Sequence, residues 1–305
     1  MKLGANDINA VKIGSTDVNK VYLGSNLVWE KVGATLLLDL YPNAAAAYSL
    51  RKLRNAYNGS AIEVRVDTTG QPTYDIGFDS NGELDTTDLL SKAGANDAYV
   101  STWYDQSGGG NDATQSNASN QPQIVASGVV IERNSTPAIQ FDGANDNISN
   151  LTSGFINTTD VSYFSVSNND ISESSGIVHA QYSINTNSIR VLNDRRTTKK
   201  RNLVVTSTAI LSYVSDLASY SNTANQRLLS AFIDSSKNMS SYKDGVVGTT
   251  DTYAGTTENN GLQLGAQAGT TFLNGTIQEV IAYNTDQSAN RAAIETNINT
   301  HYTIY

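Results

Sequence analysis

The chain has 305 residues, a length that allows one large β domain or two smaller ones with a buried core. Its 20 basic and 29 acidic side chains give a formal charge of −9 at pH 7, which disfavours nucleic acid as a partner. It has no cysteine, so packing or self-association must stabilise it in place of disulfides.

The distribution of residue types is typical of a β protein. Val, Ile, Thr, Tyr and Ser are abundant, Asn and Gly interrupt the chain at short intervals, and long stretches of helical periodicity are nearly absent. The N-terminus has no apolar signal-peptide core, and no run approaches the roughly 18 apolar residues of a membrane span. We therefore expect an all-β protein that is soluble, is made without a signal peptide and does not insert into membranes.

The first thirty residues contain a repeat of ten. Residues 7–16 align with residues 17–26, and each unit consists of a short strand-like segment closed by a Gly-Ser turn. The apolar positions of the repeat are Ile8, Val11, Ile13, Val18, Val21, Leu23, Val28 and Trp29. Two such units cannot bury these side chains alone, so the module needs a partner surface. The sequence thus predicts a docking module over residues 1–32 and one domain over residues 33–305.

Residues 18–25 (VNKVYLGS) and 27–29 (LVW) resemble the N-terminal module of many bacteriophage tail and fibre proteins. The resemblance implies a virion component, made in the host cytoplasm, that attaches to other virion proteins through residues 1–32 and carries a receptor-binding domain. Fibre-type proteins commonly form trimers, and closed symmetry would cover exposed strands, so we expect a homo-oligomer, a trimer. An ordinary β-meander explains the same residues without a virus.

Several elements follow in the first half of the domain. An apolar run at residues 36–40 predicts a buried strand. Asn43 can cap a helix, and four alanines, with Leu50 and Tyr57 on one side, predict that this helix covers residues 44–57. Strands are predicted at residues 61–66, 74–78 and 99–104, with a short helical turn at residues 87–92.

The strand at residues 99–104 ends in an abrupt break. Three glycines, Gly108 to Gly110, precede Asn111 and Asp112. Glycine tolerates positive φ, and Asn and Asp side chains hydrogen-bond to nearby backbone, so the sequence predicts a compact, specified turn here.

Four segments, residues 47–53 (AYSLRKL), 61–65 (AIEVR), 75–78 (DIGF) and 103–108 (WYDQSG), together resemble the catalytic-domain family of arabinofuranosidase B. The match extends in the same order from about Leu38 to Gly143. The resemblance implies a concanavalin-like, jelly-roll β-sandwich, the fold of a family that removes arabinose from polysaccharides.

Glycoside hydrolysis requires two carboxylates that face each other across the scissile bond. In the resembled family the motifs that carry them follow this first half, but residues 174–182 here contain no acid. The acids that remain in the second half include Glu173, Asp234, Asp244, Asp251 and Glu279. Scattered carboxylates are expected in an acidic chain, and a structural role is favoured for Glu279. We therefore assign no catalytic residue, and a glycoside hydrolase of the arabinofuranosidase type is the alternative function.

Residues 137–147 (PAIQFDGANDN) predict a strand that continues into a turn rich in oxygen ligands. Asp142, Asn145 and Asp146 are candidate calcium ligands, because hard cations bind carboxylate and amide oxygens. The spacing is not that of an EF-hand loop, and an Asx-rich turn explains the same residues. We expect no other cofactor.

The second half predicts strands at residues 162–166, 176–182, 188–192, 202–206, 227–233 and 240–242, the last turning through Asp244-Gly245 into Val246-Val247. Two interpretations fit the basic cluster at residues 195–201: contact with an acidic glycan or an oppositely charged neighbour, and, as the commoner case, a solvated hairpin tip whose charges protect the strand edges. Segments 261–266 and 272–284, with a helix over 288–302, resemble the closing strands and helix of laminin-G-like, concanavalin-like lectin domains. Ser288 is the expected helix cap, and the side with Ile294, Ile298 and Tyr302 is expected to dock on the sandwich.

The favoured function is that of a phage tail or fibre adhesin whose lectin-like domain binds a host-surface glycan. A bacterial surface glycan-binding module is a third hypothesis, which the lack of a signal peptide and of cysteines disfavours. Tyr, Asn and Ser supply aromatic faces and hydrogen bonds throughout the sequence, so no carbohydrate-binding residue stands out by its spacing.

Overall fold

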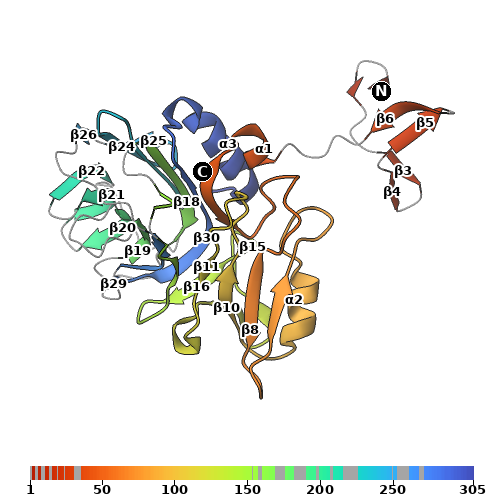
Figure 1. The fold of residues 1–305 in the computed structure, drawn as a ribbon, viewed down its shortest axis with the longest axis horizontal. Helices are drawn as coiled ribbons and strands as arrows, with labels where there is room; N and C mark the ends of the chain where they lie inside the picture. The colour runs from red at the N-terminus through yellow and green to blue at the C-terminus, as the bar shows by residue number, and fades with distance from the viewer. Residues whose placement is uncertain are drawn as a thin grey trace.

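The computed structural model describes residues 36–152, 154–156, 160–168, 226–248, 250–252, 261–267 and 271–305, and the backbone of strands between residues 2 and 30 and between residues 176 and 215. Figure 1 shows a mostly β architecture with a helix near the C-terminus. Among the described helices, none combines the length and the hydrophobicity that a membrane crossing requires.

The N-terminal repeat forms three two-stranded hairpins: β1 (Lys2–Leu3) with β2 (Asn6–Asp7), β3 (Val11–Ile13) with β4 (Thr16–Val18), and β5 (Lys20–Leu23) with β6 (Asn26–Glu30). Each pair of strands flanks one Gly-Ala or Gly-Ser dipeptide of the sequence, as the repeat predicts. None of these six strands pairs with the larger sheet. Leu23 is 74% exposed and Val28 is 37% exposed, so at least these two apolar side chains of the repeat are not buried.

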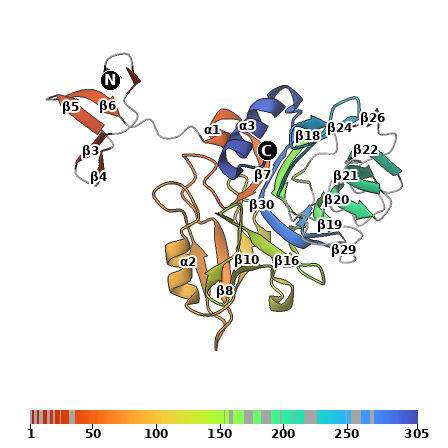
Figure 2. The ribbon, with the colours of Figure 1, turned by 180° about the vertical axis from the view of Figure 1, so that it is seen from behind.

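Most of the remaining strands form two antiparallel layers that share β10 (Ala98–Trp103). One layer contains β12 (Gln123–Ala126), β16 (Ile139–Asp142), β30 (Asn274–Tyr283), β7 (Ala44–Ser49), β18 (Val161–Ser167), β23 (Arg227–Ile233), β24 (Asn238–Lys243), β25 (Val246–Val247) and β26 (Asp251–Thr252). It also contains β13 (Val129–Val130), which pairs with β12, and β8 (Ile62–Val66) and β9 (Thr73–Ile76), which extend the sheet beyond β10. The other layer contains β11 (Ala113–Thr114), β17 (Ile148–Asn150), β27 (Leu262–Leu264), β19 (Gly176–Gln181), β20 (Arg190–Arg196), β21 (Lys199–Thr206) and β22 (Ala209–Ser215). Two separate strand pairs are β14 (Glu132–Arg133) with β15 (Thr136–Pro137) and β28 (Ala266–Gln267) with β29 (Thr271–Phe272). The architecture is therefore the predicted β-sandwich (Figure 2).

The main hydrophobic core joins side chains from both layers. It includes Tyr163 and Val280 from one layer and Ile148 and Leu264 from the other, all at most 1% exposed. Trp103, on the shared strand β10, is fully buried with its ring centroid 6.0 Å from that of Tyr48. Burial of this apolar surface is the main contribution to the stability of the sandwich.

A second hydrophobic core lies beneath the C-terminal helix. The helix α3 (Arg291–Tyr302) buries Ile294, Ile298 and Tyr302 against a cluster that contains Phe164 and Phe232, which confirms the predicted docking face. The predicted cap is wrong, because Ser288 begins a 3-10 turn (Ser288–Asn290) and Asn290 is the N-cap, without a side-chain bond. The predicted turn at residues 87–92 is the helix α2 (Thr86–Ala93), which Asp85 caps.

Two expectations at the start of the domain are wrong. Residues 37–40 form the short helix α1 (Leu37–Leu40) and not a strand. The predicted helix over residues 44–57 is also absent, because residues 44–49 form β7, which pairs with the second half of β30. Ala46 and Ala47 face different cores and are both fully buried. Tertiary pairing of these small side chains overrides their helix propensity.

The basic cluster does lie at the end of a hairpin. Arg195 pairs with Lys200 and Arg196 with Lys199 in the ladder between β20 and β21, as the sequence predicts. Residues 197–198 between them lie outside the described part of the chain, as do the side chains of both strands.

Candidate functional site

A row of polar and aromatic side chains crosses four neighbouring strands on one face of the sheet. Arg65 on β8 is the ladder partner of Tyr99 on β10, Tyr99 is the partner of Gln123 on β12, and Gln123 is the partner of Gln140 on β16. We call these four residues the polar row. Directly paired residues on adjacent strands project to the same side and lie within contact distance, so the four side chains form a continuous strip.

Strand alternation explains why this strip faces away from the core. Along β8, Val64 and Val66 point into the main core, which leaves Arg65 on the opposite face. Along β16, Ile139 and Phe141 are fully buried, which places Gln140 on the same outer face.

Two loops stand at the end of the polar row. One is the 3-10 turn at Ala118–Asn120, and the other is the turn that follows β16. The amide of Asn145 ties them together by donating to Ser119 O at 2.8 Å and to Asn120 Oδ1 at 3.1 Å. The strip and the loops enclose a pocket of about 360 Å³. The pocket is lined by the polar row and by Asp67, Ala118, Ser119, Gln121, Asp142 and Asp146.

Two of the predicted calcium ligands, Asp142 and Asp146, line this pocket, and Asn145 lies in the same tightly bonded turn. Asp142 Oδ1 accepts hydrogen bonds from the backbone N–H groups of Ala144, Asn145 and Asp146 at 2.8–3.4 Å. Asp146 Oδ2 accepts from the N–H of Asp142 at 3.0 Å. In the described part of the chain, no cluster of three or more His, Asp or Glu side chains has the arrangement of a metal site. These bonds give the turn its shape without an ion, and calcium binding by Asp142, Asn145 and Asp146 stays a prediction.

The charges of the pocket are mostly negative. Arg65 is 8% exposed, and its guanidinium lies 4.8 Å from the centroid of the Tyr99 ring. It donates to Gln121 Oε1 at 2.7 Å, to Asp67 Oδ1 at 3.3 Å and to Ala118 O at 3.3 Å. Burial, and next the neighbouring Asp142 carboxylate, raise the pKa of Asp146 to about 7.

The motif that resembles the arabinofuranosidase family is a structural clamp. Asp105, 3% exposed, accepts hydrogen bonds from the N–H groups of Ala47, Ser107 and Asn111 and from the Ser107 hydroxyl. The Gln106 side chain accepts a hydrogen bond from Leu53 N–H. Its amide donates to the carbonyls of Ser49, the last residue of β7, and of Arg51. This Asp105-Gln106 clamp satisfies the edge of β7 that β30 leaves open, so the predicted compact turn is confirmed.

One glycine of this turn is required by its surroundings. Gly108 has φ of +92°, and a Cβ atom there would lie 2.5 Å from Nη1 of Arg54, which donates to Ser107 O. The left-handed backbone conformation strains any larger residue, and the Arg54 side chain would have to shift to make room for it.

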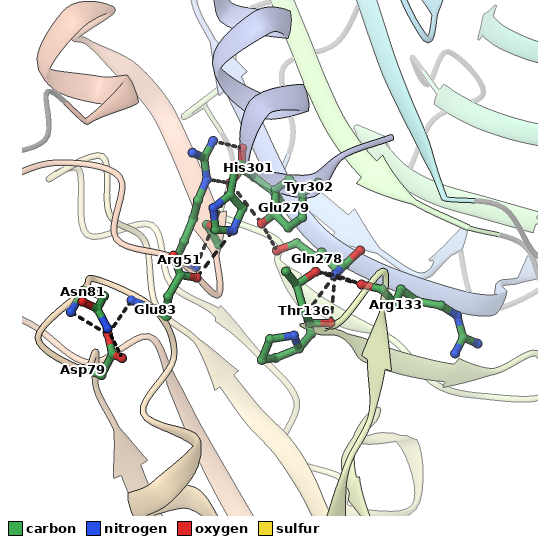
Figure 3. A network of polar contacts seen from close by, with 12 residues as sticks. Arg51, Asp79, Asn81, Glu83, Arg133, Thr136, Gln278, Glu279, His301 and Tyr302 are labelled. Atoms are coloured by element: carbon green, nitrogen blue, oxygen red, sulfur yellow. Dashed lines mark hydrogen bonds and ion pairs between the residues drawn. The ribbon is translucent and has the colours of Figure 1, made fainter. Parts of the chain in front are cut away.

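Glu279 is at the centre of a second buried network (Figure 3). It is 1% exposed and forms a bidentate ion pair with Arg51, at 2.8 Å from Nε and 3.1 Å from Nη2. The hydroxyls of Ser49 and Tyr302 also donate to its Oε2, at 2.8 and 3.3 Å. The network joins β7, β30 and α3, which supports the structural role expected for Glu279.

The other acids considered for catalysis are not gathered into one site among the described residues. Asp234 accepts from the backbone and amide of Asn238, and Asp244 accepts from Leu228 N–H and pairs with Arg227 at 3.4 Å. Glu173 and the side chain of Asp251 lie outside the described residues. Of these acids, the three whose side chains are described, Asp234, Asp244 and Glu279, therefore each bond to separate partners.

A different pocket, of about 310 Å³, lies between α1 and the clamp. Its charged residues are occupied, since Asp39 accepts from the backbone and amide of Asn55, and Arg54 donates to Ser107 O. The pocket at the polar row is the better candidate site, because it combines an aromatic ring, amides and carboxylates.

The fold is similar to that of arabinofuranosidases of known structure. Over 84% of the chain, the structure is similar to a GH54 α-L-arabinofuranosidase soaked with a cyclic sulfate inhibitor, with a TM-score of 0.62 and 15% sequence identity. It is also similar to an arabinofuranosidase complexed with arabinofuranosyl-α-1,2-xylobiose, with a TM-score of 0.58 and 16% identity. The chain spans 62% of the length of each of these proteins. It matches no model of a protein family and no curated protein sequence. The comparisons therefore establish the fold predicted from the arabinofuranosidase resemblance.

Sequence reasoning placed Asp142, Asn145 and Asp146 at one site but missed the polar row. Outward-facing polar positions are visible in each strand as alternation, yet nothing in the sequence says which strands are neighbours. The pairing of Tyr99 with Gln123 also depends on a register irregularity after Ala98, which no periodicity reveals.

Proposed function

We propose that the protein is a glycan-binding module and that the pocket at the polar row is its binding site. The observation that carries this proposal is the strip of Arg65, Tyr99, Gln123 and Gln140, which places an aromatic ring among amide and charged groups at the floor of a pocket. Sugar rings have apolar faces and many hydroxyl groups, so such a combination suits them. A volume of about 360 Å³ lies in the range of small-ligand pockets.

The proposal includes attachment of this module to a virion as a tail or fibre adhesin that binds a host-surface glycan. Its support is the N-terminal repeat, whose hairpins share no strand pairing with the sandwich and leave Leu23 and Val28 exposed. Exposed apolar strands favour association with another surface, either other virion proteins or further copies in a trimer.

The alternative is a glycoside hydrolase, which the similarity of fold favours. The carboxylates of the pocket argue against it, because Asp142 and Asp146 each accept a backbone hydrogen bond from the other within one turn. In glycoside hydrolysis two carboxyl groups act from opposite sides of the scissile bond, whereas these two belong to one turn and are held by its backbone.

Replacing Tyr99 with alanine is expected to weaken glycan binding by about tenfold, equivalent to about 1.4 kcal/mol, because the aromatic platform is lost. A glycan array followed by calorimetry with the best ligand measures the effect, and circular dichroism verifies the fold. Tyr74→Ala on β9 is the matched control, since Tyr74 contacts Lys92 and does not line the pocket. Equal losses in both variants, or turnover of an aryl arabinofuranoside by the wild type, would contradict the proposal.

Deletion of residues 1–32 tests the attachment role. The truncated chain is expected to stay folded, because the hairpins share no sheet with the sandwich, and to lose oligomerisation and incorporation into particles. Light scattering and an incorporation assay measure the two properties. Normal incorporation of the truncated chain would show that attachment occurs elsewhere.

A further inference from the structure

We infer that the pocket at the polar row selects neutral, hydroxyl-rich sugars and rejects sugars that carry a carboxylate, such as uronic and sialic acids. The inference rests on the proposed function and specifies the ligand class of the same pocket. It follows from which hydrogen-bonding groups of the pocket are already occupied and from the charges that remain.

Part of the donor capacity of the pocket is used within the protein itself. The amides of Gln121, Gln123 and Gln140 donate to the carbonyls of Gln115, Val125 and Phe141 at 2.8–3.0 Å. The Arg65 guanidinium donates to three protein oxygens and stacks on Tyr99, so its charge is held by internal partners. A ligand carboxylate, which is only an acceptor, would have to share these donor groups with their internal partners.

The acceptors, in contrast, are partly open. Asp142 uses Oδ1 for its backbone bonds and Asp146 uses Oδ2, so one oxygen of each carboxylate has no hydrogen bond within the described chain. The Oε1 atom of Gln123 likewise accepts no hydrogen bond within the described chain, because the side chain bonds only through its amide nitrogen, which donates to Val125 O. Hydroxyl groups of a sugar can donate to these oxygens, and hydrogen bonds to a carboxylate are stronger than those between neutral groups.

The charge balance points the same way. Three carboxylates, those of Asp67, Asp142 and Asp146, line the pocket with a single cation, Arg65, which is already paired with Asp67. A ligand carboxylate would add a further negative charge to this site, whereas a neutral sugar adds none.

The test compares matched pairs of methyl glycosides by saturation-transfer NMR and calorimetry: glucoside with glucuronide, and galactoside with galacturonide. At least one neutral sugar is expected to bind at least tenfold more tightly than its uronic acid. The Asp142→Asn variant keeps the acceptor Oδ1 and removes one charge. In this variant the ratio of neutral-sugar affinity to uronic-acid affinity is expected to decrease by at least threefold. Asp88→Asn on α2, which removes a charge outside the pocket, is the matched control and should leave the ratio unchanged.

Equal or tighter binding of the uronic acid at this pocket would overturn the inference and leave the proposed function standing. Loss of neutral-sugar binding in EDTA would also overturn it, because a bound cation would then hold the sugar. Failure of every neutral and acidic sugar to bind would instead refute the proposed function itself.

Discussion

Replacing Arg51 with methionine is expected to lower the free energy of unfolding by about 3–5 kcal/mol. The substitution preserves much of the side-chain volume but leaves the Glu279 carboxylate, 1% exposed, without its bidentate partner. A buried charge that loses its counterion keeps the full cost of desolvation, and the hydroxyls of Ser49 and Tyr302 cannot replace a guanidinium. Urea unfolding followed by circular dichroism measures the loss.

The pH dependence of stability separates a lost ion pair from a lost packing contact. Burial raises the pKa of Glu279, but the charge and hydrogen bonds of Arg51 outweigh it and hold the folded-state pKa below its ordinary value. The pair therefore stabilises the wild type above the unfolded-state pKa, and this contribution is lost as the pH falls through the folded-state pKa. In Arg51→Met the folded-state pKa of Glu279 lies above the unfolded value, so this variant should gain stability as the pH falls toward about 4.

The double variant Arg51→Met/Glu279→Gln is the matched control. Removal of the buried charge should recover a large part of the stability that Arg51→Met loses, and the inverted pH dependence should disappear. Loss of an exposed ion pair typically costs less than about 1 kcal/mol. If Arg51→Met lowers the free energy of unfolding by no more than that, the Glu279 network does not have the structural role proposed for it.

The Asp105→Ala variant is expected to lose about 4 kcal/mol of unfolding free energy. Three backbone N–H groups and one hydroxyl would lose their acceptor in the buried clamp, at about 1–3 kcal/mol for each unsatisfied group before relaxation. The cost should be concentrated at β7, whose free edge the clamp covers. Hydrogen exchange of the Ala47 amide, which donates to Asp105 Oδ1 at 2.8 Å, reports this directly.

Two further variants serve as references for the stability loss of Asp105→Ala. Asp105→Asn retains one acceptor oxygen and should lose about half as much stability as the alanine variant. Asp75→Ala removes an exposed carboxylate that accepts a single hydrogen bond from Tyr104, and it should cost less than about 1 kcal/mol. An Asp105→Ala protein as stable as Asp75→Ala would show that β7 does not depend on the clamp.

The sequence predicted the elements whose local pattern and tertiary role agree. Residues 62–66 alternate between apolar and polar side chains and form β8, and residues 291–302 repeat apolar side chains at helical spacing and form α3. The prediction failed at residues 44–49, where four alanines favour a helix but the pairing with β30, more than 200 residues away, imposes a strand. A prediction from neighbouring residues alone cannot identify a strand partner at that distance in the sequence.

The candidate site was predicted only in part for the same reason. The Asx-rich turn with Asp142 is a local feature and was recognised, whereas the polar row joins residues 65, 99, 123 and 140 through strand neighbours that sequence order does not give. The WYDQSG motif is the most distinctive stretch of the sequence, but its Asp105 and Gln106 side chains bond to the backbone of β7. Distinctive residues can serve the fold rather than the chemistry.

The position of β30 has a consequence for the order in which the sandwich can form. This strand, Asn274–Tyr283, lies more than 200 residues after β7 and more than 100 residues after β16 and β18, yet it pairs with all three. Each of these pairings must close a long loop before the strands can hydrogen-bond, so folding through them is slow. While β30 is unpaired, β7 and β16 present open strand edges that chaperones can shield from aggregation.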